Sequence, residues 1–261
     1  TLMREGFFRK NSKENGHFHS NWLSMMLPRL YIARNFLRED GVIFVSCDDN
    51  EVHNLRCLTN EVFGEENFLC VFAWQKRYAP PPDTKDIGYL HESIIAFRRS
   101  DQFRRNLLPI TEDQRSRYKN PDNDHRGDWK AADITCRYSA DERPSLFYPI
   151  IRPSDGKEIW PKRTRVWGLS KKVMDQYMGE RRLWWGANGS NDVPAINNFL
   201  SEIQQVMMPM SLLSYEVVGH TDEATKELRE LIPELQITPK PTRLIRHLLS
   251  IGCSTGDMVL D

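Results

Sequence analysis

Two carboxylates, Asp48 and Asp49, come directly after the apolar run at residues 42–45. A short continuous apolar run is typical of a strand that is buried on both faces of a parallel sheet. The carboxyl ends of such strands form the edge at which open α/β sheets bind ligands, so Asp48 and Asp49 are candidate ligand-binding residues. Acids at this position also cap a following helix, and the sequence favours neither role over the other.

Cations and aromatic side chains are interleaved in a second region, residues 111–172. This region has 14 Lys or Arg and 10 Asp or Glu, whereas the whole chain has 36 of each. The pattern suits phosphate contact combined with base stacking, although solvated cations around a tryptophan-centred core give the same pattern. The candidate DNA-binding residues are Arg115, Arg117, Lys119, Trp129, Lys130, Lys162, Arg163 and Arg165.

Other kinds of catalytic site find no support in the sequence. His17 and His19 lack a further metal ligand at helical spacing, and the chain has no phosphate-binding Gly-x-x-x-x-Gly-Lys loop. The five cysteines include no Cys-x-x-Cys pair, which predicts reduced side chains and no metal site. No apolar run reaches the roughly 18 residues needed to span a membrane, so we predict a cytoplasmic protein.

The elements that must position these residues begin with a helix, a strand and a second helix. Apolar spacing predicts helices at 22–37 and 52–62, on either side of the strand at 42–45. Residues 68–75 and 92–97 predict an antiparallel pair of strands. Helical spacing also predicts a short helix at 199–206. A second short helix is predicted at 221–231, which is rich in i to i+4 charge pairs and is capped by Thr221 or Asp222.

The end of the chain has the pattern of a cofactor-binding half-site. A turn at Lys240 and Pro241 opens an amphipathic helix that also contains Arg243. Residues 256–261 predict a short strand that ends on Asp261, where the loop of a nucleotide-type cofactor site is expected to begin.

Six blocks, in order along the chain, resemble the modification (Mod) subunit of type III restriction-modification systems. The blocks are residues 19–30, 40–51, 63–68, 118–124, 127–130 and 238–245. The resemblance implies an α/β fold, part of a S-adenosylmethionine-dependent methyltransferase (Rossmann-like) sheet with an inserted irregular α+β target-recognition domain. It implies a partial methyltransferase domain at 1–99, target recognition at 100–237, and a return to the methyltransferase domain at 238–261.

The chemistry implied by the resemblance is adenine-specific DNA methylation of the β class. A methyl group passes from S-adenosylmethionine to the exocyclic amine of an adenine flipped out of the duplex. In the family, an Asp-Pro-Pro-Tyr motif precedes the blocks found here and a Phe-x-Gly-x-Gly loop follows them, so no catalytic residue is assigned and we expect the chain alone to be inactive. The residues that match cofactor-binding positions are Lys240, Pro241, Arg243, Asp261, Asp48 and Asp49.

The implied partners are double-stranded DNA, a second Mod subunit in a homodimer, and a restriction (helicase-nuclease) subunit. A non-catalytic DNA-binding or subunit-interaction module is the alternative, and a piece that only supports structure is a third.

Overall fold

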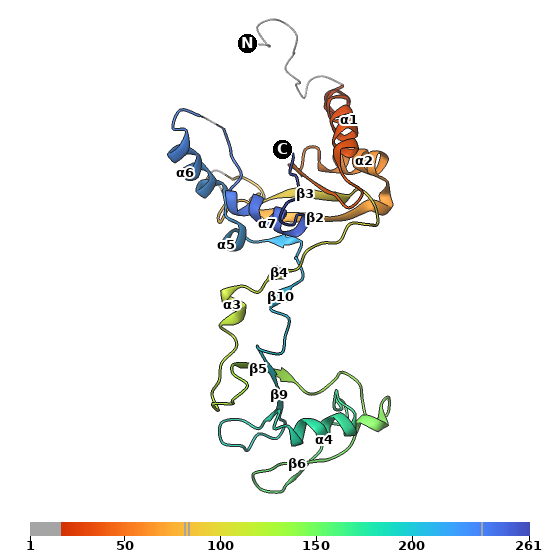
Figure 1. Cartoon of the computed structure of the whole chain (residues 1–261), viewed down its shortest axis with the longest axis vertical. Helices are drawn as coiled ribbons and strands as arrows, with labels where there is room; N and C mark the ends of the chain where they lie inside the picture. Colours follow the sequence, from red (N-terminus) through yellow and green to blue (C-terminus); the bar gives the residue numbers. More distant parts are fainter. Residues whose placement is uncertain (1–16, 81, 83, 236) are drawn as a thin grey trace, which may run out of the picture. The chain divides into compact units, whose positions relative to one another are not determined.

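The computed structural model describes residues 17–80, 82, 84–235 and 237–261, which form two compact units. The described residues up to Leu108 join Met208–Asp261 in the first unit, and Pro109–Met207 form the second (Figure 1). These boundaries differ from the predicted range 100–237 because α5 (Tyr215–Val218) and α6 (Thr221–Leu231) belong to the first unit. Residues 1–16 of the predicted range 1–99 lie outside the described residues.

The described part of the first unit is built on a four-stranded sheet. Its strand order is β1 (Val42–Cys47), β3 (His91–Arg98), β2 (Phe68–Gln75) and β11 (Leu212–Leu213). Strand β3 is antiparallel to both β1 and β2, so the antiparallel pair predicted for 68–75 and 92–97 is confirmed. The strand predicted at 42–45 is present as β1, and among the described residues it pairs with β3 alone, so the parallel sheet predicted around it stays a prediction.

Helices cover both faces of this sheet. Alternation along β1 packs Ile43 and Val45 against the core under α1 (Phe18–Phe36) and α2 (Val52–Phe63). Figure 1 shows these two helices next to each other in the first unit. On the other face, α7 (Thr242–Gly252) comes so close to β1 that a Cβ on Gly252 would lie 2.5 Å from Val42 Cγ1. The core between α1, α2 and the sheet consists of Leu30, Leu55, Val62, Phe63, Ile95 and Phe97. No helix in the described part of the chain has the length and apolarity to cross a membrane.

The second unit has a small sheet of its own, in the order β5 (Trp129–Asp133), β9 (Ala195–Phe199) and β8 (Leu183–Trp184). The helix predicted at 199–206 is wrong, because Phe199 ends β9 and Val206 begins β10. Alternation in β9 buries Asn197 and Phe199 on one face, which is a strand pattern. The shorter elements of the chain are η1 (Glu65–Asn67), β4 (Leu108–Pro109), α3 (Glu112–Arg115), η2 (Pro144–Leu146), β6 (Ile150–Ile151), β7 (Glu158–Ile159), α4 (Lys171–Gly179) and β10 (Val206–Met207).

The strand predicted at 256–261 is wrong, since residues 253–261 are irregular. Met258 and Leu260 are 95% and 74% exposed. A strand needs a neighbour that satisfies its backbone groups, and no described strand pairs with this segment. The apolar pattern alone was therefore insufficient to form a strand here.

Candidate functional sites

Acidic side chains gather where β1 ends, and we call Asp48, Glu51 and Glu92 the strand-end cluster. Glu92 belongs to β3, but it lies beside the end of β1 because Cys47 pairs with Ser93. Burial, together with the negative charges of Asp48, Glu51 and Glu92, raises the pKa of Cys47 to about 11. The three carboxylates therefore all lie near one point at the carboxyl end of β1.

Asp48 shapes the turn between β1 and α2. Its Oδ1 accepts a hydrogen bond from Asn50 N at 3.1 Å, and its Oδ2 accepts one from Asn50 Nδ2 at 2.9 Å. The N-cap of α2 is Glu51, without a side-chain capping bond, so the capping role considered for Asp48 and Asp49 is wrong. Both aspartates are exposed at the edge of the sheet.

Lys240 reaches this same edge. Its Nζ lies 3.5 Å from Glu92 Oε2, and Lys76 Nζ lies 3.7 Å from the other oxygen, Glu92 Oε1. The Lys240 ammonium also lies 5.8 Å from the centre of the Trp74 ring. Pro241, the N-cap of α7, directly follows Lys240. The structure thus places Glu92, a member of the strand-end cluster, between the ammonium groups of Lys76 and Lys240.

Arg243 and Asp261, which the sequence grouped with Lys240, lie apart from these ion pairs. Arg243 donates to both carboxylate oxygens of Glu223, at 2.7 and 2.6 Å, and to the backbone oxygen of Glu216 at 2.9 Å. The hydrogen bonds from Arg243 lower the pKa of Glu223. Asp261 is exposed in the irregular segment after α7. Arg243 therefore ties α5, α6 and α7 together.

The candidate cations of the second unit fall into two groups. Each arginine lies within 4.0 Å of a carboxylate, and the pairs are Arg115 with Glu112, Arg117 with Asp113, Arg163 with Asp141, and Arg165 with Asp133. Lys119, Lys130 and Lys162 have no carboxylate within that distance among the residues that the structure describes. The three lysines are therefore the uncompensated charges of the set.

Trp129 is part of the core of the second unit. Its side chain is 5% exposed, its Nε1 donates to Asp122 Oδ1 at 2.8 Å, and its ring centre lies 5.2 Å from that of Trp184. A buried ring with an occupied N–H group has no free face for a base. At Trp129 the structure therefore supports the interpretation of a tryptophan in the core, which the sequence had left open beside base stacking.

A surface pocket of about 250 Å³ lies beside two of the predicted cations. Its lining includes Arg117, Tyr118 and Lys130, together with apolar side chains such as Ile110 and Val206. Lys130 Nζ lies 5.8 Å from the centre of the Tyr118 ring. An aromatic face next to two cations can take a base or a phosphate group.

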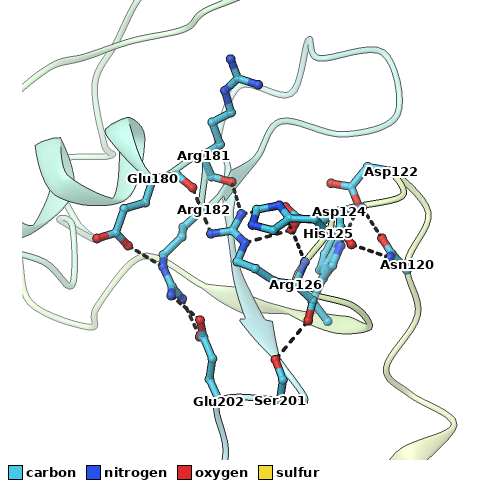
Figure 2. Close-up of polar contacts among 11 residues, drawn as sticks. Asn120, Asp122, Asp124, His125, Arg126, Glu180, Arg181, Arg182, Ser201 and Glu202 are labelled. Carbon is cyan, nitrogen blue, oxygen red and sulfur yellow. Dashed lines mark hydrogen bonds and ion pairs between the residues drawn. The ribbon is translucent and has the colours of Figure 1, made fainter.

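The polar network in Figure 2 holds the loops of the second unit against its sheet. Arg126 donates to Asp124 Oδ1 at 2.9 Å, to Asp124 Oδ2 at 2.6 Å and to the backbone oxygen of Glu180 at 3.0 Å. Arg182 bridges Glu180 and Glu202 in the same network. The hydrogen bond from Arg126 holds the pKa of Asp124 well below its usual range.

The lowered pKa of Asp124 predicts that acid destabilises the second unit. Because the folded-state pKa is below the unfolded value of about 3.9, the contribution is complete above about pH 4 and is lost as the pH falls. Urea unfolding followed by tryptophan fluorescence at pH 7, 4 and 3 measures this loss. Asp124→Asn should lower stability at pH 7 and flatten the dependence on pH. An equally steep loss of stability in wild type and variant would contradict the prediction.

Comparison with known proteins identifies the family. A family model described as DNA methylase matches residues 4–261. The chain belongs to the DNA methylase family. Members of this family need a methyl donor. In this chain the strand-end cluster, Lys76 and Lys240 lie in the first unit, at an edge where α/β sheets bind ligands.

Three relatives illustrate where this DNA methylase fits. It is 31% identical over 93% of its length to the type III restriction-modification enzyme EcoPI Mod subunit of Escherichia phage P1, and covers 41% of that protein. It is 26% identical over 97% of its length to the StyLTI Mod subunit of Salmonella typhimurium, and covers 38% of it. It is 25% identical over 93% of its length to the type II methyltransferase M.KpnI of Klebsiella pneumoniae, and covers 60% of it. The chain thus spans about two fifths of the length of these Mod subunits.

Sequence reasoning missed several polar residues of this methylase that the structure brings together. Glu51 and Glu92 reach the strand-end cluster from different elements, and Lys76 joins Glu92 from the end of β2. The one local signal was the acidic character of residues 48–51. The remaining contacts depend on strand register, which no short motif encodes.

Proposed function

We propose that this chain is part of an adenine-specific DNA methyltransferase of a type III restriction-modification system. The enzyme transfers a methyl group from S-adenosylmethionine to the exocyclic amine of adenine in double-stranded DNA. The similarity to Mod subunits along 93–97% of the chain carries this proposal. Because its substrate is cellular DNA, we place the enzyme in the cytoplasm. Its partners in this proposal are a second Mod subunit and a restriction subunit.

The two units have separate roles in this proposal. The first unit supplies part of a Rossmann-like methyltransferase sheet, supported by helices on both faces and by polar residues at one strand edge. The second unit, Pro109–Met207, is the inserted target-recognition domain. Its own sheet and core support independent folding, and its cations support contact with phosphates.

The residues at the strand edge fit the polar groups of S-adenosylmethionine. Lys240 is 32% exposed and only loosely paired with Glu92, so a ligand carboxylate can reach it. Asp48 and Asp49 are exposed acceptors for ligand hydroxyl or ammonium groups. Arg243 does not fit a role in binding the cofactor carboxylate, because its Nε and Nη2 groups already donate to Glu223. We therefore assign Lys240, Asp48 and Asp49 to the cofactor edge and Arg243 to a supporting role.

The uncompensated lysines predict how DNA binding depends on salt. Replacing Lys119, Lys130 and Lys162 with glutamine should reduce the slope of log K against log salt by about 0.9 for each DNA phosphate that is no longer neutralised. Fluorescence anisotropy with a labelled duplex at several salt concentrations measures the slope. The matched control is the double variant Arg117→Gln/Asp113→Asn, which removes an ion pair without changing net charge. A lysine variant with the wild-type slope would contradict this DNA interface.

The decisive test is methyl transfer. Tritiated S-adenosylmethionine and duplex DNA are incubated with this chain and with a chain extended at both ends by its native gene sequence. We expect transfer to adenine by the extended chain only. If the extended chain binds DNA without methylating it, the protein is a binding module, and the proposed enzymatic function is wrong.

A further inference from the structure

His19 and Glu51 form a dyad that the proposed function has not used. His19 lies in the first turn of α1, and Glu51 is the N-cap of α2. His19 Nδ1 and Glu51 Oε1 are 2.8 Å apart, although 32 residues separate them along the chain. Asn54 Nδ2 donates to the second carboxylate oxygen, Glu51 Oε2, at 2.8 Å. Both oxygens of this carboxylate are therefore held by named partners.

The carboxylate determines which ring nitrogen of His19 remains available. An ionised carboxylate only accepts hydrogen bonds, so in the neutral ring Nδ1 carries the proton and Nε2 carries the lone pair. Asn54 Nδ2 also lies 3.4 Å from Nδ1, but it is closer to Glu51 Oε2. The Glu51 side chain is 7% exposed and the His19 side chain 57%. A buried carboxylate thus orients a ring that a ligand can reach, which is the arrangement of a histidine general base.

The dyad also lies where a reacting group is expected. Glu51 is a member of the strand-end cluster, and its charge helps to raise the pKa of Cys47 together with those of Asp48 and Glu92. Ligands of open α/β sheets bind at this edge. The ring centres of Phe18 and His53 lie 5.2 and 6.5 Å from that of His19. The dyad therefore joins the starts of two helices at the ligand-binding edge of the first unit.

We infer that His19 accepts the proton that the target amine loses during methyl transfer, and that Glu51 is the residue that positions it. This inference rests on the proposed function. The amine nitrogen forms a bond to the methyl carbon and displaces a sulfide, whose sulfur keeps the electron pair of the broken bond. The nitrogen then holds one proton too many, and His19 Nε2 takes that proton and passes it to water. No other reactant is required.

Four substitutions in the extended chain test the inference by single-turnover methyl transfer. His19→Gln removes the base, and Glu51→Gln offers an amide donor to Nδ1 and so favours the tautomer with its proton on Nε2. Each should slow the reaction about 100-fold, the usual contribution of general base catalysis, without changing the Kd for DNA or S-adenosylmethionine. His53→Gln, at the neighbouring exposed ring, is the control and should keep the wild-type rate. Added imidazole should restore part of the rate of His19→Ala.

A second measurement does not depend on turnover. Diethyl pyrocarbonate should modify His19 in the free protein, and duplex DNA with a non-reactive cofactor analogue should protect it, as mapped by mass spectrometry. His53 should stay equally reactive in both states. An unprotected His19, or a folded His19→Gln variant with the wild-type rate, overturns the inference. A slow variant that also has a lower Tm, does not bind DNA and is not rescued by imidazole overturns the inference. Such a result would mean that His19 and Glu51 only hold α1 and α2 together. Inactivity of the wild-type extended chain instead overturns the proposed function.

Discussion

Replacing Trp167 with alanine should lower the free energy of unfolding of the second unit by about 3–5 kcal/mol. Trp167 is fully buried, and its core neighbours include Ile134, Ile150 and Met174. The substitution leaves a large cavity, because the surrounding side chains come from several strands and a helix and cannot all close on it. It also removes the hydrogen bond from Trp167 Nε1 to the backbone oxygen of Tyr148, which is 2.7 Å long.

Urea unfolding monitored by circular dichroism measures this loss, and Trp160→Ala is the matched control. Trp160 is 48% exposed, and its ring packs at a tilt against Phe147, with 5.1 Å between the ring centres. Its removal should cost far less, because most of its surface is already in water. Equal losses in the two variants would show that Trp167 is not at the centre of a tightly packed core.

Phe97→Ala should destabilise the first unit to a similar extent, by about 3–5 kcal/mol. Phe97 is 1% exposed, and its ring centre lies 5.8 Å from that of Phe63 and 5.5 Å from that of Phe68. It therefore joins α2 to both antiparallel strands, and its loss should loosen the elements that hold the strand-end cluster.

Thermal unfolding and limited proteolysis read out this change, with cleavage expected in α1 and α2. The control is Phe36→Ala at the end of α1, where the ring is 73% exposed. A proteolysis pattern that is the same for Phe97→Ala and wild type would mean that this ring does not hold the helices to the sheet.

The helices and the central hairpin could be predicted because their signals are local. Helical apolar spacing identified α1 and α2, the Lys240-Pro241 turn and amphipathic pattern identified α7, charge pairs identified α6, and apolar, β-branched and aromatic runs identified the pair β2–β3. Predictions of finer features, such as the residue that caps a helix, were wrong where contacts outside the local sequence pattern decided the outcome. His220, and not Thr221 or Asp222, caps α6, with its ring nitrogen accepting from Glu223 N. Histidine is an uncommon cap, so residue preference favoured the wrong positions.

The candidate sites were predicted less well than the elements. The acids after β1 were found because they follow a strand, but the partnership of His19 with Glu51 joins residues far apart in sequence. Trp129 shows the opposite problem, since a core tryptophan and a base-stacking tryptophan have the same sequence pattern among cations. Only burial distinguishes the two roles, and burial depends on the register of β5 with β9.

In the DNA interface proposed above, the pairing of each candidate arginine with a carboxylate has a consequence for movement along DNA. A guanidinium that already holds a carboxylate gains little by exchanging it for a phosphate, because one charge-assisted contact replaces another. On DNA of any sequence the proposed interface would therefore be held mainly by Lys119, Lys130 and Lys162, the uncompensated members of the candidate set, whose contacts are diffuse and permit sliding. The arginines would change partners only where the duplex offers better-aligned acceptors than the carboxylates, so they would prolong the residence time at the target sequence and not during the search.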